Sequence, residues 1–187
     1  MMANNISGKK VAFLLTNGVE QAELTEPWKA VQEAGGQPVL VSPEEGQITA
    51  MKGDWEYGDT FTVDQQLSQA KADDFDAIVL PGGTLNADKM RLESEAVALV
   101  RAFAEAGKPI SAICHAPWLL IEADLVKGRH MTSYASLESD LKNAGANWVD
   151  EEVVTDRGLT TSRNPGDLKA FCSKMLEEIS EGQHSEV

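Results

Sequence analysis

The sequence predicts an α/β protein with a mainly parallel sheet that is covered by helices on both faces. Short apolar runs alternate with stretches of helical spacing along the whole chain, which is typical of βαβ units with right-handed crossovers. The apolar runs are nearly continuous, as expected for strands that are buried on both faces. No repeat or low-complexity linker interrupts the pattern, so we expect one domain over residues 1–187 that ends in a polar, frayed tail at 182–187.

Each element has a local signal. Residues 11–15 form the first apolar run, and the helical stretch 20–35 after it ends at Gly35-Gly36, a typical C-terminal stop. Residues 47–63 are rich in Gly, Thr and aromatics, which indicates a hairpin or an irregular excursion. Pro117 suits the first turn of a helix because its missing N–H would be unpaired there. The other expected strands are 38–42, 75–80, 109–113, 131–132, 148–149, 153–155 and 159–162; the other expected helices are 94–107, one from about 117, 137–144 and 167–180.

The charge balance excludes some partners. The net charge is −14, with no basic patch, so the surface repels phosphate backbones and anionic membranes. Residues 1–10 have neither the apolar segment nor the cleavage pattern of a signal peptide, and no apolar stretch is long enough to span a bilayer. With only two cysteines and no secretory signal, we expect a cytoplasmic protein with free thiols.

Cys114 is the candidate nucleophile. It follows the expected strand 109–113 and precedes a helix start, where partial positive charge and free N–H groups favour a thiolate. Free cysteines are more often buried structural residues, so position alone supports function only modestly. His115 strengthens the case because a base beside a thiol suits nucleophilic catalysis, whereas His130 and His184 have no such neighbour.

Two other turns end at the same edge of the expected sheet. Gly83, in Pro81-Gly82-Gly83, offers a backbone N–H that could form an oxyanion hole with the N–H of His115, although a plain tight turn explains two glycines equally well. Glu20 opens the first helix, either as an ordinary N-terminal acid or as a carboxyl group that faces the sulfur. Cys172 lies on the apolar stripe of the last helix and is expected in the core. No metal-ligand spacing is present, so we expect no metal and no cofactor.

The chain resembles the DJ-1/PfpI superfamily, in the branch of intracellular protease I and the bacterial general stress proteins, over nearly its whole length. Five segments together carry the resemblance: GVEQAEL at 18–24, DAIVLPGG at 76–83, AICHAP at 112–117, NAGA at 143–146 and TSRNPGDL at 161–168. The resemblance implies a flavodoxin-like (class I glutamine amidotransferase-like) three-layer sandwich. It also implies a nucleophile at Cys114, a partner at His115, an oxyanion-hole glycine at Gly83 and, at Glu20, a carboxyl group that hydrogen-bonds the sulfur.

The resemblance further implies that an acidic residue orients the histidine across a subunit interface. Asp88 is the nearest match, in a segment one residue longer than in the archaeal proteases, so we expect a homo-oligomer, a dimer or larger. Trp118 stands where the family often has Gln and could line or narrow the substrate pocket, and Tyr134 matches a tyrosine near the protease I site.

The sequence is compatible with three functions. The first is a stress-related cysteine hydrolase whose thiolate attacks the carbonyl carbon of a peptide, a glycated adduct or a small dicarbonyl, with acid–base work by His115 and Glu20. The second is a redox-sensing or stress-protective protein whose Cys114 oxidises to sulfenic or sulfinic acid with little turnover. The third and weakest is a nucleotide-binding module, for which no phosphate-cradling loop is present.

Overall fold

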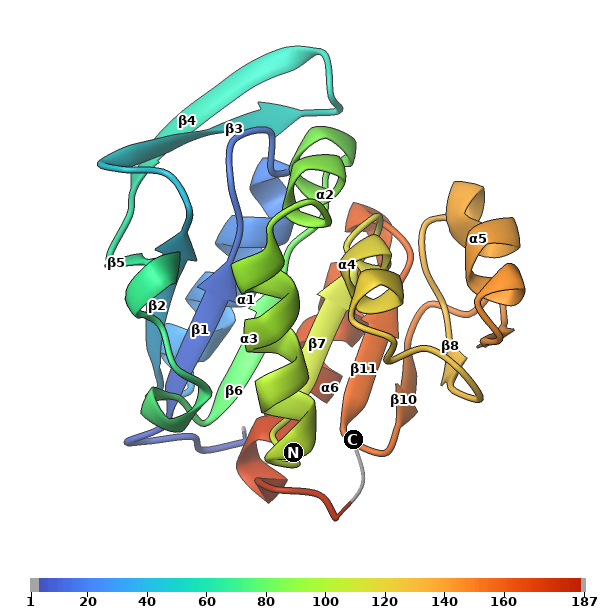
Figure 1. Ribbon diagram of the computed structural model, residues 1–187. Coiled ribbons are helices and arrows are strands. Elements are labelled where there is room, and N and C mark those ends of the chain that lie inside the picture. Colours follow the sequence, from blue (N-terminus) through green and yellow to red (C-terminus); the bar gives the residue numbers. More distant parts are fainter. Residues whose placement is uncertain (1–3, 186–187) are drawn as a thin grey trace.

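The computed structural model describes residues 4–185, and a seven-stranded sheet forms its centre (Figure 1). The strand order is β10-β11-β7-β6-β1-β2-β5, and all neighbours are parallel except β10 and β11. The strands of this sheet are β1 (Lys10–Leu14), β2 (Gln37–Ser42), β5 (Gln65–Gln66), β6 (Ala77–Leu80), β7 (Ile110–Ile113), β10 (Val154–Asp156) and β11 (Leu159–Ser162). The predicted α/β class with a mainly parallel sheet is confirmed.

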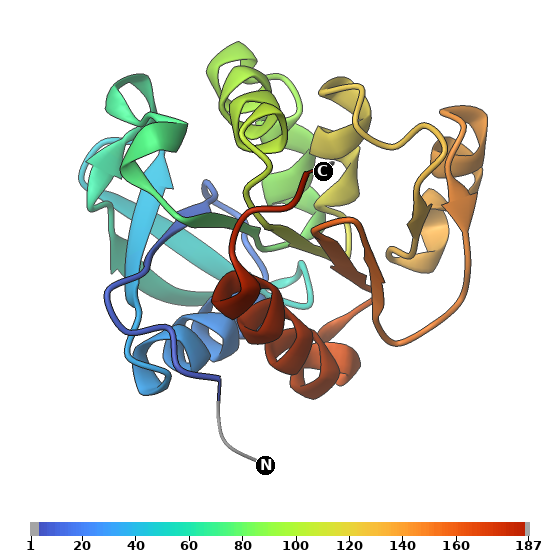
Figure 2. The same ribbon diagram turned by 90° about the horizontal axis from the view of Figure 1, so that it is seen from below.

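Helices cover both faces of the sheet and produce three layers, seen end-on in Figure 2. One face carries α1 (Gln21–Glu33) and α6 (Leu168–Glu181), and the other carries α2 (Thr84–Met90), α3 (Ser94–Glu105) and α4 (Pro117–Glu122). A smaller lobe contains α5 (Glu138–Asn143) and the short pair β8 (His130–Met131) and β9 (Asn147–Trp148). Four short 3₁₀ turns complete the described elements: Leu67–Gln69, Ala72–Asp74, Ala135–Leu137 and Pro165–Asp167.

Two hydrophobic cores lie on the two faces of the sheet, and the strands supply both. Along β1, Val11 and Phe13 enter the core beneath α1 and α6, whereas Ala12 and Leu14 enter the core beneath α3 and α4. This alternation is the two-residue period of a strand, with both sets of side chains apolar. It explains why the sequence shows continuous apolar runs. Because β1, β6 and β7 pair in parallel, their carboxyl ends lie at one edge of the sheet.

The segment 47–63 forms the predicted hairpin, which stands apart from the main sheet above that edge (Figure 1). Strands β3 (Gln47–Lys52) and β4 (Glu56–Thr62) pair antiparallel, with an irregularity between Thr49 and Met51. The backbone N–H of Met51 donates to the carbonyl of Val19 at 2.8 Å. The hairpin is therefore tied to the loop that follows β1.

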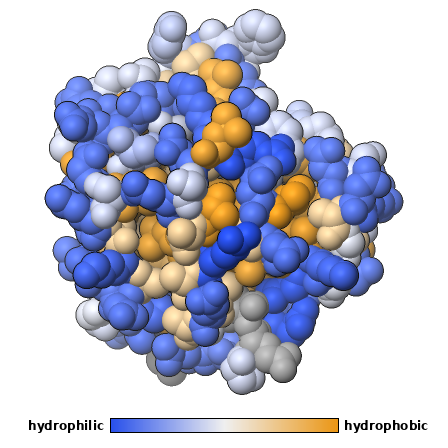
Figure 3. All heavy atoms as spheres, viewed as in Figure 1, coloured by the Kyte–Doolittle hydropathy of each residue, from blue (hydrophilic) through white to orange (hydrophobic). Residues whose placement is uncertain are grey.

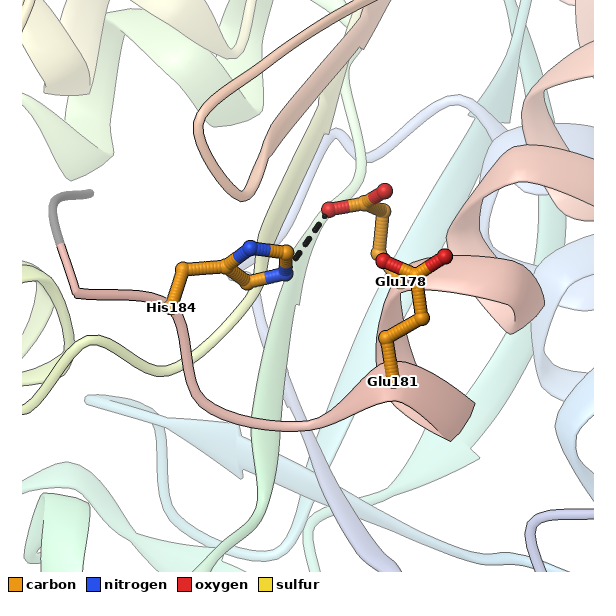
Figure 4. A group of neighbouring side chains, drawn as sticks. All are labelled: Glu178, Glu181 and His184. Carbon is orange, nitrogen blue, oxygen red and sulfur yellow. Dashed lines mark ion pairs between the residues drawn. The ribbon is translucent and has the colours of Figure 1, made fainter.

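The C-terminal tail is ordered further than predicted. After α6 the chain turns at Gly182, with φ 86°, and the His184 N–H donates to the carbonyl of Gly107 at 2.7 Å. The His184 ring lies 3.0 Å from the buried carboxylate of Glu178 (Figure 4). The expectation of a frayed tail is wrong for residues 182–184, because these contacts tie the tail to the turn before β7 and to α6. Residues 186–187 of the expected tail lie outside the described part of the chain.

Candidate active site

Cys114 lies immediately after β7 in a strained backbone conformation. Its φ is +64°, in the left-handed region that non-glycine residues seldom occupy, at a cost of about 1–3 kcal/mol. Two hydrogen bonds hold this turn: the Cys114 N–H donates to the carbonyl of Ser162 at 3.1 Å, and the Tyr134 N–H donates to the carbonyl of Cys114 at 2.8 Å. The predicted strand-to-helix turn is thus present, and it aims a side chain that is only 6% exposed.

His115 lies within hydrogen-bonding distance of the thiol. Its Nδ1 is 3.1 Å from Sγ of Cys114, and its ring is buried against two aromatic side chains. Tyr134 stacks on the imidazole with ring centroids 4.4 Å apart, and Trp118 meets it edge-on at 5.3 Å. Burial lowers the pKa of His115 below 6.5, against an opposing effect from the negative charge of Asp54. The imidazole is therefore neutral at neutral pH and can accept a proton.

Two backbone N–H groups converge on the sulfur. They belong to Gly83 and to His115, the pair expected to form an oxyanion hole, and both stabilise negative charge at Cys114. Gly83 has φ +89°, and a Cβ there would lie 2.5 Å from the backbone nitrogen of Glu20, so only glycine fits.

Glu23, and not Glu20, is the carboxyl group beside the sulfur. Glu23 interacts with the Cys114 thiol, is 0% exposed, and accepts a hydrogen bond from the Gly82 N–H through Oε2 at 2.8 Å. The expectation for Glu20 is wrong because that residue precedes α1. Its carboxylate instead accepts a hydrogen bond from the Gly53 N–H at 2.9 Å, in the hairpin turn.

Burial determines which form of Glu23 faces the thiol. It raises the pKa of Glu23 from 4.5 to about 8, although the hydrogen bonds with Cys114 and Gly82 act in the opposite direction. The carboxyl group is therefore largely protonated at neutral pH. Its Oε1 has no nitrogen or oxygen partner among the described residues, so this oxygen is free to carry the proton.

Burial also affects the pKa of the Cys114 thiol. Burial raises the pKa of the thiol above its ordinary value, and an ionised Glu23 raises it further, whereas the N–H groups of Gly83 and His115 lower it. A neutral Glu23 removes the repulsion and can donate a hydrogen bond to the sulfur. The two N–H groups oppose the cost of a buried thiolate, and a protonated Glu23 can add to their effect, although the net pKa of the thiol is still raised.

Asn86 fixes the glycine turn and was missed by sequence reasoning. Its buried amide nitrogen donates to the carbonyls of Pro81 at 3.0 Å and Gly82 at 2.9 Å, and its oxygen accepts from the Thr16 N–H at 2.8 Å. Asn86 joins the ends of β1 and β6, which positions Gly83 next to the sulfur.

The sequence did contain a signal that Glu23 is buried. Glu23 lies on the same helix face as the buried Leu24, Pro27 and Val31.

Asp88 is exposed on α2. Within residues 4–185 of this chain, no hydrogen bond or ion pair joins it to His115, so its role across a subunit interface stays a prediction. Nearby, Leu85 and Leu92 are 46% and 81% exposed. Figure 3 shows hydrophobic surface over α2, and further hydrophobic patches lie across the middle of the same face between hydrophilic side chains.

One group of described side chains has the composition of a metal site, and it lies far along the chain from Cys114. Glu178, Glu181 and His184 place one ligand atom each within 4.8 Å of one another (Figure 4). Glu178 and His184 already form an ion pair with each other, which accounts for the arrangement without an ion. Two of the larger cavities, of about 610 Å³ beside α3 and about 430 Å³ beside Trp28, contain none of the residues around Cys114.

Comparison with known proteins gives consistent results. The DJ-1/PfpI family matches residues 9–178. General stress protein 18 of Bacillus subtilis is 42% identical over 171 residues, which cover 90% of this chain and 96% of that protein. Deglycase PfpI of Pyrococcus furiosus is 39% identical over 168 residues, which cover 90% and 98%. The crystal structure of Drosophila melanogaster DJ-1beta superimposes with a TM-score of 0.83 at 30% identity and covers 92% of this chain and 90% of that one.

Proposed function

We propose that this chain, which belongs to the DJ-1/PfpI family, is a cysteine-dependent hydrolase that attacks the carbonyl carbon of its substrate. The observation that carries the proposal is the position of Cys114, 3.1 Å from Nδ1 of His115 and within reach of two backbone N–H donors. A nucleophile, a base and an oxyanion site thus occupy one edge of the sheet.

The reaction would begin with transfer of the thiol proton to His115. The thiolate then forms a bond to the carbonyl carbon, and the negative charge that develops on the carbonyl oxygen is held by the N–H groups of Gly83 and His115. With a peptide, the tetrahedral adduct collapses by breaking the C–N bond, and the protonated imidazole gives its proton to the leaving amine. Water, activated by the same imidazole, then releases the acyl group from the sulfur. A small dicarbonyl has no leaving group, so its adduct takes up the proton and becomes a hemithioacetal. Neutral Glu23 stabilises the thiolate by donating a hydrogen bond to it.

Candidate substrates share an electrophilic carbonyl carbon: peptides, early glycation adducts of side chains, and small dicarbonyls. Deglycases occur among the relatives by name, which favours glycation adducts as the first class to assay. The test is turnover of all three classes by wild type, Cys114→Ser and Cys172→Ser at equal concentration. We expect turnover of at least one class that Cys114→Ser abolishes and Cys172→Ser preserves. Full turnover by Cys114→Ser on every class would contradict the proposal.

A redox role is the second candidate, and the same donors favour it. Protonated Glu23 and the N–H groups of Gly83 and His115 could hydrogen-bond an oxygen added to the sulfur. Attack of the thiolate on hydrogen peroxide forms an S–O bond and releases hydroxide, leaving a sulfenic acid, and a second peroxide gives the sulfinic acid. Intact mass after peroxide titration tests this role. A Cys114 that oxidises no faster than a model thiol would exclude it.

We also propose that the protein works as a homo-oligomer in the cytoplasm. The exposed Leu85, on α2 with Asp88, and Leu92, two residues after that helix, offer apolar side chains for a contact with a second copy of this chain. Light scattering coupled to size exclusion tests the oligomer. A monomer at micromolar concentration would contradict it, and with it the role of Asp88 across an interface.

A further inference from the structure

A threonine hydroxyl links the imidazole of His115 to a carboxylate within the same chain. Oγ1 of Thr84, the first residue of α2, donates to Oδ2 of Asp54 at 2.7 Å. The Thr84 N–H donates to the other carboxylate oxygen at 3.2 Å. On its opposite side, Oγ1 of Thr84 lies 3.5 Å from Nε2 of His115. Carboxylate, hydroxyl, imidazole and thiol therefore follow one another in a continuous series that ends at Cys114.

The direction of these hydrogen bonds determines the tautomer of the imidazole. A hydroxyl has one hydrogen, and Thr84 gives it to Asp54, so only lone pairs of Oγ1 face His115. This arrangement favours a ring hydrogen on Nε2, which leaves the lone pair of Nδ1 directed at the Cys114 sulfur. Ser136, whose Oγ lies 3.4 Å from Nε2, is compatible because its own hydroxyl can also accept. The Thr84 to His115 distance of 3.5 Å is at the long end of the range for a hydrogen bond.

We propose that Asp54 is a positioning residue that acts through Thr84 to hold His115 in the tautomer able to take the proton from Cys114. In the step it supports, the S–H bond breaks, the proton moves to Nδ1, and an imidazolium faces a thiolate. The carboxylate of Asp54 lies on the far side of that imidazolium and favours its charge. The inference rests on the proposed function, because only there does the proton transfer matter.

The hairpin is anchored so that Asp54 stays in place. Asp54 lies in the turn between β3 and β4 with φ +64°, and its neighbour Gly53 donates its N–H to the carboxylate of Glu20 at 2.9 Å. Glu20, which was expected beside the sulfur, therefore supports the turn that carries Asp54.

The series from the Asp54 carboxylate through Thr84 and His115 to Cys114 is called the relay below. Three substitutions separate its parts. In Asp54→Asn the new amide can donate to Thr84, so the threonine hydrogen turns toward Nε2 and favours the opposite tautomer. Thr84→Val removes the hydroxyl, whereas Thr84→Ser keeps it. Glu56→Gln is the matched control, because it removes an exposed carboxylate two residues away in the same hairpin.

The experiment combines the tautomer with the reactivity of the thiol. Long-range ¹H–¹⁵N spectra of the labelled full-length protein at neutral pH identify the protonated nitrogen of His115, assigned with His115→Gln. We expect Nε2–H in wild type, Thr84→Ser and Glu56→Gln, and a shift toward Nδ1–H in Asp54→Asn. Iodoacetamide alkylation of Cys114 should slow about tenfold or more in Asp54→Asn and Thr84→Val, and stay within about twofold of wild type in the other two.

Neither readout needs a substrate. A protein with this pattern that hydrolyses no carbonyl compound would contradict the proposed function and still support the relay. If Asp54→Asn keeps both the wild-type tautomer of His115 and the wild-type alkylation rate of Cys114, the relay is overturned. If Asp54→Asn fails to fold by circular dichroism, Thr84→Val decides, and an unchanged alkylation rate in that variant also overturns it.

Discussion

The two cysteines of the chain have opposite surroundings. Cys114 is almost fully buried in a strained turn at a strand end, whereas Cys172 is half-buried in the regular helix α6. Burial raises the pKa of both thiols, to about 12 for Cys172, where the charge of Glu26 adds to the effect. Exposure alone would therefore rank Cys172 as the more reactive thiol.

We expect the polar partners of Cys114 to reverse that ranking. Cys114 has two backbone N–H donors, a protonated carboxyl group and an imidazole nitrogen at 3.1 Å. Among the described residues, the charge that acts on Cys172 is that of Glu26, which disfavours the thiolate. A buried cysteine becomes a nucleophile through groups that accept its proton and stabilise the negative charge of its thiolate. Each prediction below removes or isolates one of those groups.

The largest effect is expected from Cys114→Ser. Serine keeps the shape of the side chain but loses the acidity and nucleophilicity of the thiol, so turnover should fall by about 10³-fold or more. Cys172→Ser should change turnover by less than about twofold, because no group of the site contacts it. Steady-state kinetics of both variants on the same substrate decide the matter. A comparable loss in both would remove the distinction between the two thiols.

Gly82→Ala should disturb the site without altering any polar group. A Cβ at Gly82 would lie 2.3 Å from Oε2 of Glu23 and 2.7 Å from both the Cys114 Cβ and the Ile113 carbonyl. The carbonyl belongs to β7 and cannot move freely, so we expect a loss of about 1–3 kcal/mol in the free energy of unfolding. Cys114 alkylation should slow as Glu23 is displaced. Urea unfolding and alkylation rates measure the two effects, and wild-type values for both would show that the contacts are not as close as described.

Glu23→Gln should change how stability depends on pH. The folded-state pKa of Glu23 is raised to about 8 from an ordinary 4.5, so the folded protein holds a proton that the unfolded chain releases across that window. This contribution to stability is complete below pH 4.5 and is lost as pH rises toward 8, with a slope of up to about 1.4 kcal/mol per pH unit. The difference between wild-type and Glu23→Gln unfolding curves from pH 5 to 9 gives the slope. A flat difference would mean that Glu23 is ionised in the folded state.

The smallest effect is expected from Glu20→Gln. The amide oxygen can still accept the Gly53 N–H, so the hairpin turn keeps its anchor, and no contact with the sulfur is lost. Cys114 alkylation should stay within about twofold of wild type, whereas Glu23→Ala should slow it about tenfold or more because the hydrogen-bonding carboxyl group is gone. Slower Cys114 alkylation in Glu20→Gln than in Glu23→Ala would show that Glu20, as first expected from the sequence, is the carboxyl group beside the sulfur.

Much of the fold could be predicted because the apolar runs carry the strands directly. The expected strands ending at residues 80 and 113 both appear, and with them the turns that carry Gly83 and Cys114. The helix Thr84–Met90 was missed, since seven residues with few apolar positions give too short a pattern. Cys172 was expected in the core but lies at its edge, because a helical stripe does not show how far the neighbouring element extends.

The parts of the site that depend on tertiary contacts could not be predicted. Glu20 was expected beside the sulfur because it opens the helix and matches the glutamate that the family resemblance implies, and only the helix boundary at Gln21 shows that Glu23 turns inward. The bond between Thr84 and Asp54 joins residues 30 positions apart, across a hairpin whose register no local pattern determines. Strand ends locate the nucleophile, whereas packing determines its partners.

The most direct test of the central claim is competition between the two cysteines for a limiting amount of iodoacetamide in the native protein at neutral pH. Peptide mapping by mass spectrometry then gives the labelled fraction at each site. We predict that Cys114 is labelled first, although it is the less exposed thiol, and that Glu23→Ala narrows the difference between the labelled fractions of the two cysteines. Preferential labelling of Cys172 would contradict the claim that polar partners make Cys114 the nucleophile.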